Sequence, residues 1–357
     1  MKVPHVEILV NEADPENDIK NVIAAFKPEW KTEEIQFKTS KKEATAGLLN
    51  TMIKCYTHPK PLDAIMIRVY GSPKIAEYLN RINEVKNIKL IHDLYGFAPQ
   101  LLATFTNGFC YKYICGEIMT RETVRLPKNA KIIAKQLALL HSTKIEEDFQ
   151  LPSIINKYLL SVLPFGYPES LKKPEDDVRF QKYLPKKAFV EVECKRVIDR
   201  VKEFNLETVL SHNDMRSENI VWNKETGLIT FVDWECAGTS PLPADIAYHF
   251  WRYSGIEDMD LSMYPDKDFQ MEWLRTYLET YYSQTKSDEN KNVSDIDVER
   301  LYVQVNTYYL LNLIQGVASV GFTDDMDDFP LDLIEIGRKS YIEYLKLRDS
   351  ILSLKMP

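Results

Sequence analysis

The sequence predicts an α+β protein with a small, mainly β part over residues 1–115 and a larger, mainly helical part over residues 116–357. Two observations carry this prediction. Before residue 115, short runs rich in Ile and Val surround one helical pattern, and after it amphipathic helical patterns dominate. The chain of 357 residues, with 45% hydrophobic and 27% charged residues, is long and apolar enough to bury two such cores.

The small part is predicted to be an antiparallel sheet with one helix packed on it. The runs VEILV (6–10) and DAIMIRVYG (63–71) are typical of strands because they are rich in β-branched residues. Residues 72–95 place apolar side chains at helical spacing. The segments QLLATFTNG (100–108) and FCYKYI (109–114) are split by Asn-Gly, which predicts a hairpin.

The large part is predicted to be helical wherever apolar residues recur with helical spacing. These segments are residues 129–142, 191–205, 268–284, 298–319 and 330–354. The polar run 283–295 is expected to be a loop. Residues 150–190, rich in Pro, Lys and Tyr, are expected to form irregular surface.

Composition excludes several classes of partner and location. The net charge of −8 and the pI near 5.5 make nucleic acid a poor partner. The five cysteines are scattered singly, which fits a reducing compartment better than a disulfide framework. The first residues do not have the pattern of a signal or transit peptide, and no apolar run is long enough for a membrane helix. We therefore expect a cytoplasmic protein without a membrane span.

A hairpin near the middle of the chain carries the first sign of chemistry. The segments NIVWN (219–223) and LITFVDWE (228–235) read as strands joined by the turn KETG. Pairing centred on Thr226 would place Asn219 opposite Asp233, with β-carbons about 5 Å apart. Amide and carboxylate oxygens at that separation could share one Mg²⁺ ion, which prefers hard oxygen ligands.

Asp214 lies on the loop that leads into this hairpin, five residues before Asn219. A loop carboxylate near a metal and phosphate is suited to accept a hydroxyl proton. A base, a metal ligand five residues later and a strand-end Asp form the arrangement of a phosphoryl-transfer site. Taken singly, such residues are more often caps and turn formers, and their combination at the ends of apolar strands favours the site.

At this point the chain resembles a known family, the choline/ethanolamine kinases, a branch of the protein-kinase-like phosphotransferases. The resemblance rests on SHNDMRSENIVWN, FVDWE and PADIAYHF, and it continues through IMIRVYG, APQLLATFTNGFCYKYICGE and YPDKDFQMEWLRTYLE. It covers nearly the whole chain and points to the ethanolamine kinases within the family. It implies a bilobal protein-kinase-like fold, ATP as co-substrate, Mg²⁺, and transfer of phosphate to the hydroxyl of ethanolamine on the CDP-ethanolamine route to phosphatidylethanolamine.

The resemblance also implies roles for residues of the large part. Asp214 would be the base that faces the substrate hydroxyl, while Asn219 and Asp233 would hold Mg²⁺. Glu235 would belong to the same acidic cluster and contribute to substrate binding. Asp245, in PADIAYHF, is expected to be a structural acid that anchors the catalytic loop. We expect His212 to brace that loop, and we assign no metal or nucleophile role to it or to His249.

The small part would then bind the nucleotide. Arg68 would stand where protein kinases place their phosphate-binding lysine, with Glu84 as its ion-pair partner; without the resemblance, Arg68 could equally be an edge-strand residue that reaches water. Backbone groups of Tyr113 and Ile114 would meet adenine at a hinge. The phosphate loop, TAGLLNTMIK, would contribute Gly47 and Asn50, although it has one glycine where protein kinases use three.

The acceptor pocket departs from the family pattern. The family closes its cation site with tryptophans on a late helix, but an ungapped comparison puts Gly316 and Ser319 there, and no Trp follows Trp273. A trimethylammonium group cannot donate hydrogen bonds and depends on such aromatic faces, whereas a primary ammonium can use acids and carbonyls. The loss favours ethanolamine over choline. Trp251 and Tyr308 could still supply an aromatic wall, or could be ordinary core aromatics.

Three alternatives stay open at this point. The enzyme could be a choline kinase or a kinase of both alcohols. It could instead be a pseudokinase that binds nucleotide as a scaffold, although a scaffold does not need the acids and Arg68 described above. A metallophosphoesterase is disfavoured because the Asp-x-His cluster of a two-metal site is absent. The sequence leaves the oligomeric state open, a homodimer included.

Overall fold

The computed structural model describes residues 3–11, 14–39, 50–57, 63–71, 81–145, 166–287, 291–324 and 331–357. Its contacts divide the chain into two compact units. Unit 1 comprises Met1–Ile118 and Glu218–Glu235, and unit 2 comprises Met119–Ser217 and Cys236–Pro357. Residues 218–235 thus pack with the first unit, and the division into functional lobes after residue 115 stays a prediction.

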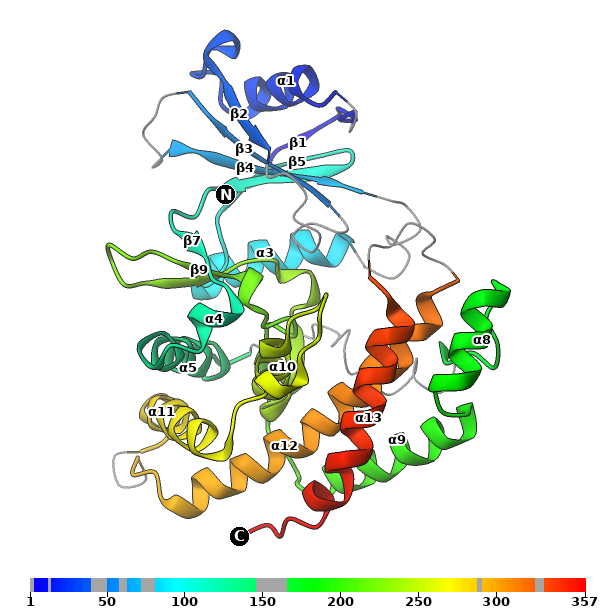
Figure 1. Cartoon of the computed structure of the whole chain (residues 1–357). Helices are drawn as coiled ribbons and strands as arrows, with labels where there is room; N and C mark the ends of the chain where they lie inside the picture. Colours follow the sequence, from blue (N-terminus) through cyan, green and yellow to red (C-terminus); the bar gives the residue numbers. More distant parts are fainter. Residues whose placement is uncertain are drawn as a thin grey trace. The chain divides into compact units, whose positions relative to one another are not determined.

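Unit 1 is built on a six-stranded sheet with the order β1-β5-β6-β4-β3-β2 (Figure 1). The strands are β1 (His5–Val6), β2 (Gln36–Thr39), β3 (Asn50–Tyr56), β4 (Ile65–Tyr70), β5 (Leu101–Phe105) and β6 (Gly108–Lys112). Among these six described strands, only β1 runs parallel to its neighbour, β5. The predicted hairpin at Asn-Gly is confirmed as β5–β6, and the predicted strand at 63–71 is confirmed as β4. The predicted strand at 6–10 is limited to a two-residue bridge that begins one residue earlier.

Gly108 occupies a position in β6 that no larger residue could take. A β-carbon there would lie 2.1 Å from the carbonyl oxygen of Arg68 on the neighbouring strand β4. Such a distance is far below van der Waals contact, so glycine alone allows the two backbones to approach this closely. The Asn-Gly turn therefore also serves the packing around Arg68.

Within the described residues of unit 1, two α-helices accompany the sheet. The helix α3 (Arg81–Tyr95) confirms the predicted helix over its described part, and residues 72–80 lie outside the described residues. The helix α1 (Glu16–Phe26) was not predicted. It buries Ile19, Val22 and Ile23 completely in the core of the sheet, at spacings of three and one that match one helix face.

A smaller sheet of unit 1 contains the hairpin predicted to carry metal ligands. It joins β10 (Ile229–Phe231), β9 (Ile220–Trp222) and β7 (Glu117–Ile118). The predicted hairpin is confirmed, but its predicted register is wrong by one residue. Val221 pairs with Thr230, so in this register Asn219 lies opposite Val232 and not opposite Asp233. The Val232 N–H donates to the Asn219 carbonyl at 2.9 Å.

The turn of this hairpin explains the shift in register. The Asn223 side-chain oxygen accepts the N–H groups of Glu225 and Thr226, at 3.0 and 3.1 Å. Gly227, with φ of +72°, then completes a loop closed between Asn223 and Leu228. This Asx turn, followed by a left-handed glycine, shifts the strand pairing by one residue relative to the register predicted for a loop centred on Thr226.

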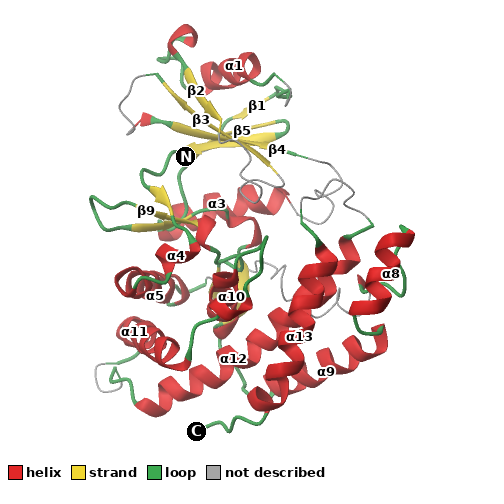
Figure 2. Ribbon diagram, in the orientation of Figure 1, coloured by secondary structure: helices red, strands yellow, loops and turns green. Residues whose placement is uncertain are grey.

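Unit 2 is mainly helical, with one small sheet (Figure 2). The α-helices among its described residues are α4 (Arg121–Val124), α5 (Pro127–His141), α8 (Pro174–Tyr183), α9 (Lys187–Lys202), α10 (Pro243–Trp251), α11 (Lys267–Thr285), α12 (Asp295–Ala318) and α13 (Leu333–Leu352). The sheet pairs β8 (Thr208–Ser211) with β11 (Gly238–Pro241). All five predicted helical segments are confirmed, as α5, α9, α11, α12 and α13.

The expectation of irregular surface over 150–190 is wrong for its second half, where α8 forms. Pro174 occupies the first turn, where its missing N–H costs no hydrogen bond, and three acids follow it in that turn. Phe180 is buried beneath the helix. Residues 150–165 lie outside the described residues. No helix within the described ranges combines the length and the apolar composition that crossing a bilayer requires.

Candidate active site

In unit 1, Arg68 lies at the centre of a cluster of carboxylates. Its Nη1 lies 2.8 Å from Glu84 Oε1 and 2.6 Å from Asp233 Oδ1, and its Nη2 lies 2.5 Å from Glu235 Oε2. Arg68 is on β4, between β3 and β6, and is 4% exposed. The predicted ion pair with Glu84 is confirmed, and the alternative of an edge-strand arginine reaching water is wrong.

The cluster carries more negative than positive charge. Three carboxylates against one guanidinium leave a formal charge of −2. Burial opposes the charge of Arg68, but Asp233, Glu84 and Glu235 outweigh it and raise the Arg68 pKa well above its ordinary value. One oxygen from each carboxylate lies within 4.8 Å of the others, a spacing at which they could act together on a cation. Hard oxygen donors with excess negative charge suit Mg²⁺.

The backbone of Asp233 is held in an unusual conformation. Its φ of +66° is in the left-handed region, which a residue with a side chain rarely adopts. The conformation costs on the order of 1 kcal/mol or more and persists only where the surroundings fix it. β10 ends at Phe231 and is separated from Asp233 by Val232, and the Asp233 carboxylate meets Arg68. Asn219 is buried next to β9, and its neighbour Val232 precedes Asp233.

The other residues predicted to bind the nucleotide lie on β3, outside the described residues, or just after β6. Asn50 begins β3, opposite Tyr70, while Gly47 lies outside the described residues. The Tyr113 N–H donates to the Ala64 carbonyl at 3.0 Å, so that donor is already used within unit 1. An adenine at this hinge would therefore have to use the Tyr113 carbonyl or groups of the following residues, of which Ile114 is half-buried.

In unit 2, Asp245 fixes the loop that carries Asp214. The buried Asp245 accepts the backbone N–H of His212 at 2.7 Å and that of Asn213 at 2.6 Å. Asn213 has a φ of +63°, and its side chain binds the Cys236 carbonyl and the Ser240 hydroxyl. Two backbone donors on one carboxylate are the reason the chain can hold this strained turn. The prediction of Asp245 as the structural acid is confirmed.

Asp214 itself is held from two sides. The Tyr248 hydroxyl donates to its Oδ1 at 2.9 Å, and the Arg216 Nε lies 3.2 Å from its Oδ2. The backbone N–H of Asp214 lies 3.3 Å from His212 Nδ1, in keeping with the expected bracing role of that histidine. Both oxygens are thus oriented, as a positioned base requires. Sequence reasoning missed Tyr248 and Arg216; the only signal was their closeness to the HND and PADI motifs.

The predicted aromatic residues fall into different surroundings. Trp251, at the end of α10, is 3% exposed, and its ring meets Tyr248 edge-on at 5.6 Å. Gly316 on α12 lies against it, because a β-carbon at Gly316 would be 3.4 Å from Trp251 Cζ2. Tyr308 is buried on α12, and in the described parts of the chain no hydrogen bond or ring contact joins it to Asp214 or Trp251.

His249 gives a prediction about stability. It is buried, with its Nδ1 3.0 Å from the Met215 carbonyl, and burial lowers its pKa from 6.5 to about 4. Below pH 6.5, His249 therefore binds a proton in the unfolded chain but stays neutral in the folded chain until the pH nears 4. Stability from this group is complete above pH 6.5 and falls as the pH approaches 4.

Urea unfolding should show this loss as about 2 kcal/mol between pH 7 and pH 5. His249→Gln should be less stable than wild type at pH 7 and should lack that part of the pH dependence. If the variant and the wild type lose stability in parallel over this range, the assignment to His249 is incorrect.

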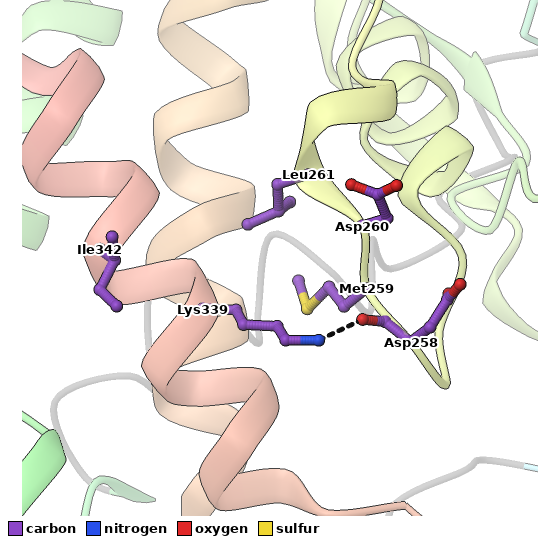
Figure 3. A pocket seen from close by; sticks show the side chains of 6 residues that line it. All are labelled: Asp258, Met259, Asp260, Leu261, Lys339 and Ile342. Atoms are coloured by element: carbon purple, nitrogen blue, oxygen red, sulfur yellow. Dashed lines mark hydrogen bonds between the residues drawn. The ribbon is translucent and has the colours of Figure 1, made fainter.

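A separate hollow of about 300 Å³ lies in unit 2 (Figure 3). It is lined by Asp258, Met259, Asp260, Leu261, Lys339 and Ile342. Its charged groups are already engaged: Lys339 donates to the Asp258 carbonyl, and the Asp258 carboxylate accepts Arg121 at 2.6 and 2.7 Å. It contains none of the predicted site residues, and we assign it no part in the site.

Unit 2 holds a positioned loop carboxylate, Asp214, and unit 1 holds an arginine among carboxylates, Arg68. These are the groups of a protein-kinase-like phosphotransferase. Solved structures share this fold. An ethanolamine kinase from Plasmodium vivax superposes with a TM-score of 0.74 and 24% identity, covering 94% of this chain and 89% of its own. A choline kinase from Cryptosporidium parvum gives 0.70 and 18%, covering 94% and 97%.

Sequence comparison identifies the family. The family model described as choline/ethanolamine kinase matches residues 42–345. A probable ethanolamine kinase of Nematostella vectensis is 32% identical over 99% of both chains. Ethanolamine kinase 1 of Mus musculus is 29% identical over 100% of this chain and 96% of its own. The chain belongs to the choline/ethanolamine kinase family, and it is a phosphotransferase that uses ATP and acts on an alcohol.

Proposed function

We propose that this enzyme phosphorylates ethanolamine to phosphoethanolamine, with Mg·ATP as phosphate donor. The observation that carries the proposal is the full-length similarity to proteins named ethanolamine kinases, including the two reported above. The resulting phosphoethanolamine would enter the CDP-ethanolamine route to phosphatidylethanolamine. A cytoplasmic location and a homodimer stay predictions.

Asp214 is the proposed base of the reaction. Its carboxylate is fixed by Tyr248 and Arg216, so it can orient the acceptor hydroxyl and take its proton as the bond to phosphorus forms. Positioning supplies much of the rate in such reactions, because the protein has little covalent chemistry to perform. Asp245 therefore contributes to the reaction indirectly, because it fixes the loop that positions Asp214.

Asn219 and Asp233 are the proposed ligands of Mg²⁺. The fit rests on the oxygen donors and on the formal charge of −2 in the cluster of Asp233, Glu84, Glu235 and Arg68. When bound, the metal neutralises phosphate charge and orients the nucleotide. Arg68 holds the neighbouring carboxylates in place and adds a permanent positive charge for phosphate oxygens.

Ethanolamine is favoured over choline because the chain lacks the late-helix tryptophans of the family. At Gly316 a β-carbon would meet Ser340 Oγ at 2.2 Å and Trp251 Cζ2 at 3.4 Å, so α12 offers no aromatic face at that position. A trimethylammonium group would lose the aromatic contacts on which its binding depends. A primary ammonium keeps its hydrogen bonds with oxygen acceptors.

The proposal is tested by offering ethanolamine, choline and monomethylethanolamine separately to purified protein with Mg·ATP, and by measuring kcat/KM for each. We expect ethanolamine to give the highest value, and choline a value at least about tenfold lower. ATP hydrolysis without acceptor is the control. Comparable values for choline would point to a kinase of both alcohols, and binding of Mg·ATP without turnover of any acceptor would favour a scaffold.

A further inference from the structure

The guanidinium group of Arg252 packs against two aromatic rings. Its guanidinium carbon lies 4.0 Å from the centroid of the Trp251 ring and 4.8 Å from that of Tyr248. Among the residues that the structure describes, no carboxylate lies within ion-pair distance of it, and its Nε is buried without a hydrogen-bond partner. Aromatic faces thus take the place that a carboxylate usually fills beside an arginine.

This aromatic corner adjoins the proposed base. The Arg252 Nη2 donates to the Tyr248 hydroxyl at 2.9 Å, and that hydroxyl donates to Asp214 Oδ1 at 2.9 Å. The guanidinium is therefore two hydrogen bonds away from the carboxylate that would receive the acceptor hydroxyl. An amino alcohol whose hydroxyl binds Asp214 carries its nitrogen only two carbons further on. The two hydrogen bonds of 2.9 Å each place the Arg252 Nη2 no more than twice 2.9 Å, or 5.8 Å, from Asp214 Oδ1, a distance that such an acceptor can span.

We propose that Arg252 occupies the cation site of this aromatic corner and so excludes acceptors with a quaternary ammonium group. The inference rests on the proposed function, because it names the residue that selects among amino alcohols. The faces of Trp251 and Tyr248 would attract a trimethylammonium group if they were open. With the guanidinium in place, such a group meets both occupied volume and like charge.

Charge and volume make separable contributions. Two guanidinium groups, those of Arg252 and Arg216, against the one carboxylate of Asp214 leave a formal charge of +1 in this corner. That charge weakens the binding of every cationic acceptor, ethanolamine included. Occupied volume acts mainly against the three methyl groups of choline, because the small primary ammonium needs no aromatic face. Selectivity therefore depends on volume more than on charge.

Two kinds of variant separate these contributions. Arg252→Ala removes the charge and opens the corner, and Arg252→Ser is a second small variant should Arg252→Ala not fold. Arg252→Met removes the charge but keeps most of the volume. Arg179→Ala, which removes an arginine paired with Asp332 on the surface of unit 2, is the control.

For the small variants, we expect the ratio of kcat/KM for choline to that for ethanolamine to rise roughly tenfold. Their affinity for tetramethylammonium ion, measured by calorimetry, should rise by a similar factor. Arg252→Met and Arg179→Ala should keep the wild-type ratio. A folded small variant with unchanged ratio and unchanged tetramethylammonium affinity overturns the inference.

The calorimetric measurement keeps this inference apart from the proposed function. Tetramethylammonium has no hydroxyl, so its binding does not depend on phosphoryl transfer. Tighter binding by Arg252→Ala in an enzyme that does not phosphorylate ethanolamine would support the inference and refute the proposed substrate. Unchanged binding in an active ethanolamine kinase would refute the inference alone.

Discussion

Replacing Asp214 by alanine should abolish phosphoryl transfer while leaving ATP binding nearly intact. The carboxylate is held by Tyr248 and Arg216 in unit 2, in the position proposed for the base. Loss of a positioned general base lowers kcat by about 10²–10⁴-fold, and we expect the upper part of this range because the same group also orients the acceptor. Steady-state kinetics gives kcat, and calorimetry gives the dissociation constant of Mg·ATP.

Two further variants make this experiment selective. Asp214→Asn keeps the size of the side chain and an oxygen for the Tyr248 hydroxyl, so its loss of activity cannot be ascribed to collapse of the loop. Asp258→Ala removes a carboxylate of unit 2 that lines the hollow of Figure 3 and binds Arg121, and it should keep kcat within about twofold. An Asp214→Ala enzyme that retains a tenth of the wild-type kcat would rule out the role of base.

Replacing Asp233 by alanine should weaken the binding of Mg·ATP itself. The side chain is a proposed metal ligand, and it also occupies one side of Arg68 at 2.6 Å. Its loss changes the formal charge of the cluster from −2 to −1, which reduces the attraction for a divalent cation. We expect the dissociation constant of Mg·ATP to rise at least about tenfold, and the Mg²⁺ concentration needed for half-maximal rate to rise with it.

The matched control for this variant is Asp63→Ala. Asp63 is a carboxylate of unit 1 that is largely exposed and pairs with Lys27. Its removal should leave Mg·ATP binding unchanged, since exposed ion pairs contribute little. If Asp233→Ala binds Mg·ATP as tightly as Asp63→Ala does, Asp233 is not a ligand of the metal.

The residues whose roles could be predicted from the sequence are those with strong local signals. The hairpin at Asn107-Gly108, the long helices after residue 268 and the anchoring role of Asp245 follow from turn chemistry, periodicity and motif. The pairing of Arg68 with Glu84 followed from the resemblance, and the structure confirms it. In each case, the information lies in a few neighbouring residues or in a recognised motif.

The features that sequence reasoning missed depend on specific side-chain contacts, which the periodicity of apolar residues does not report. The register of the β9–β10 hairpin is set by the side chain of Asn223, which the alternation of apolar residues does not report. The helix α8 forms because Phe180 finds a buried site in unit 2. Arg252 could not be assigned because its link to Asp214 through the Tyr248 hydroxyl forms only when α10 and the HND loop pack together.

The most direct test of the account is to incubate the wild-type enzyme with Mg·ATP and ethanolamine and to identify the product by ³¹P NMR. The account predicts one new phosphomonoester resonance, that of phosphoethanolamine, formed in equal amount to ADP and absent when Asp214→Asn replaces the wild type. ADP accompanied only by inorganic phosphate, or no ADP at all from an enzyme that binds Mg·ATP, would contradict it.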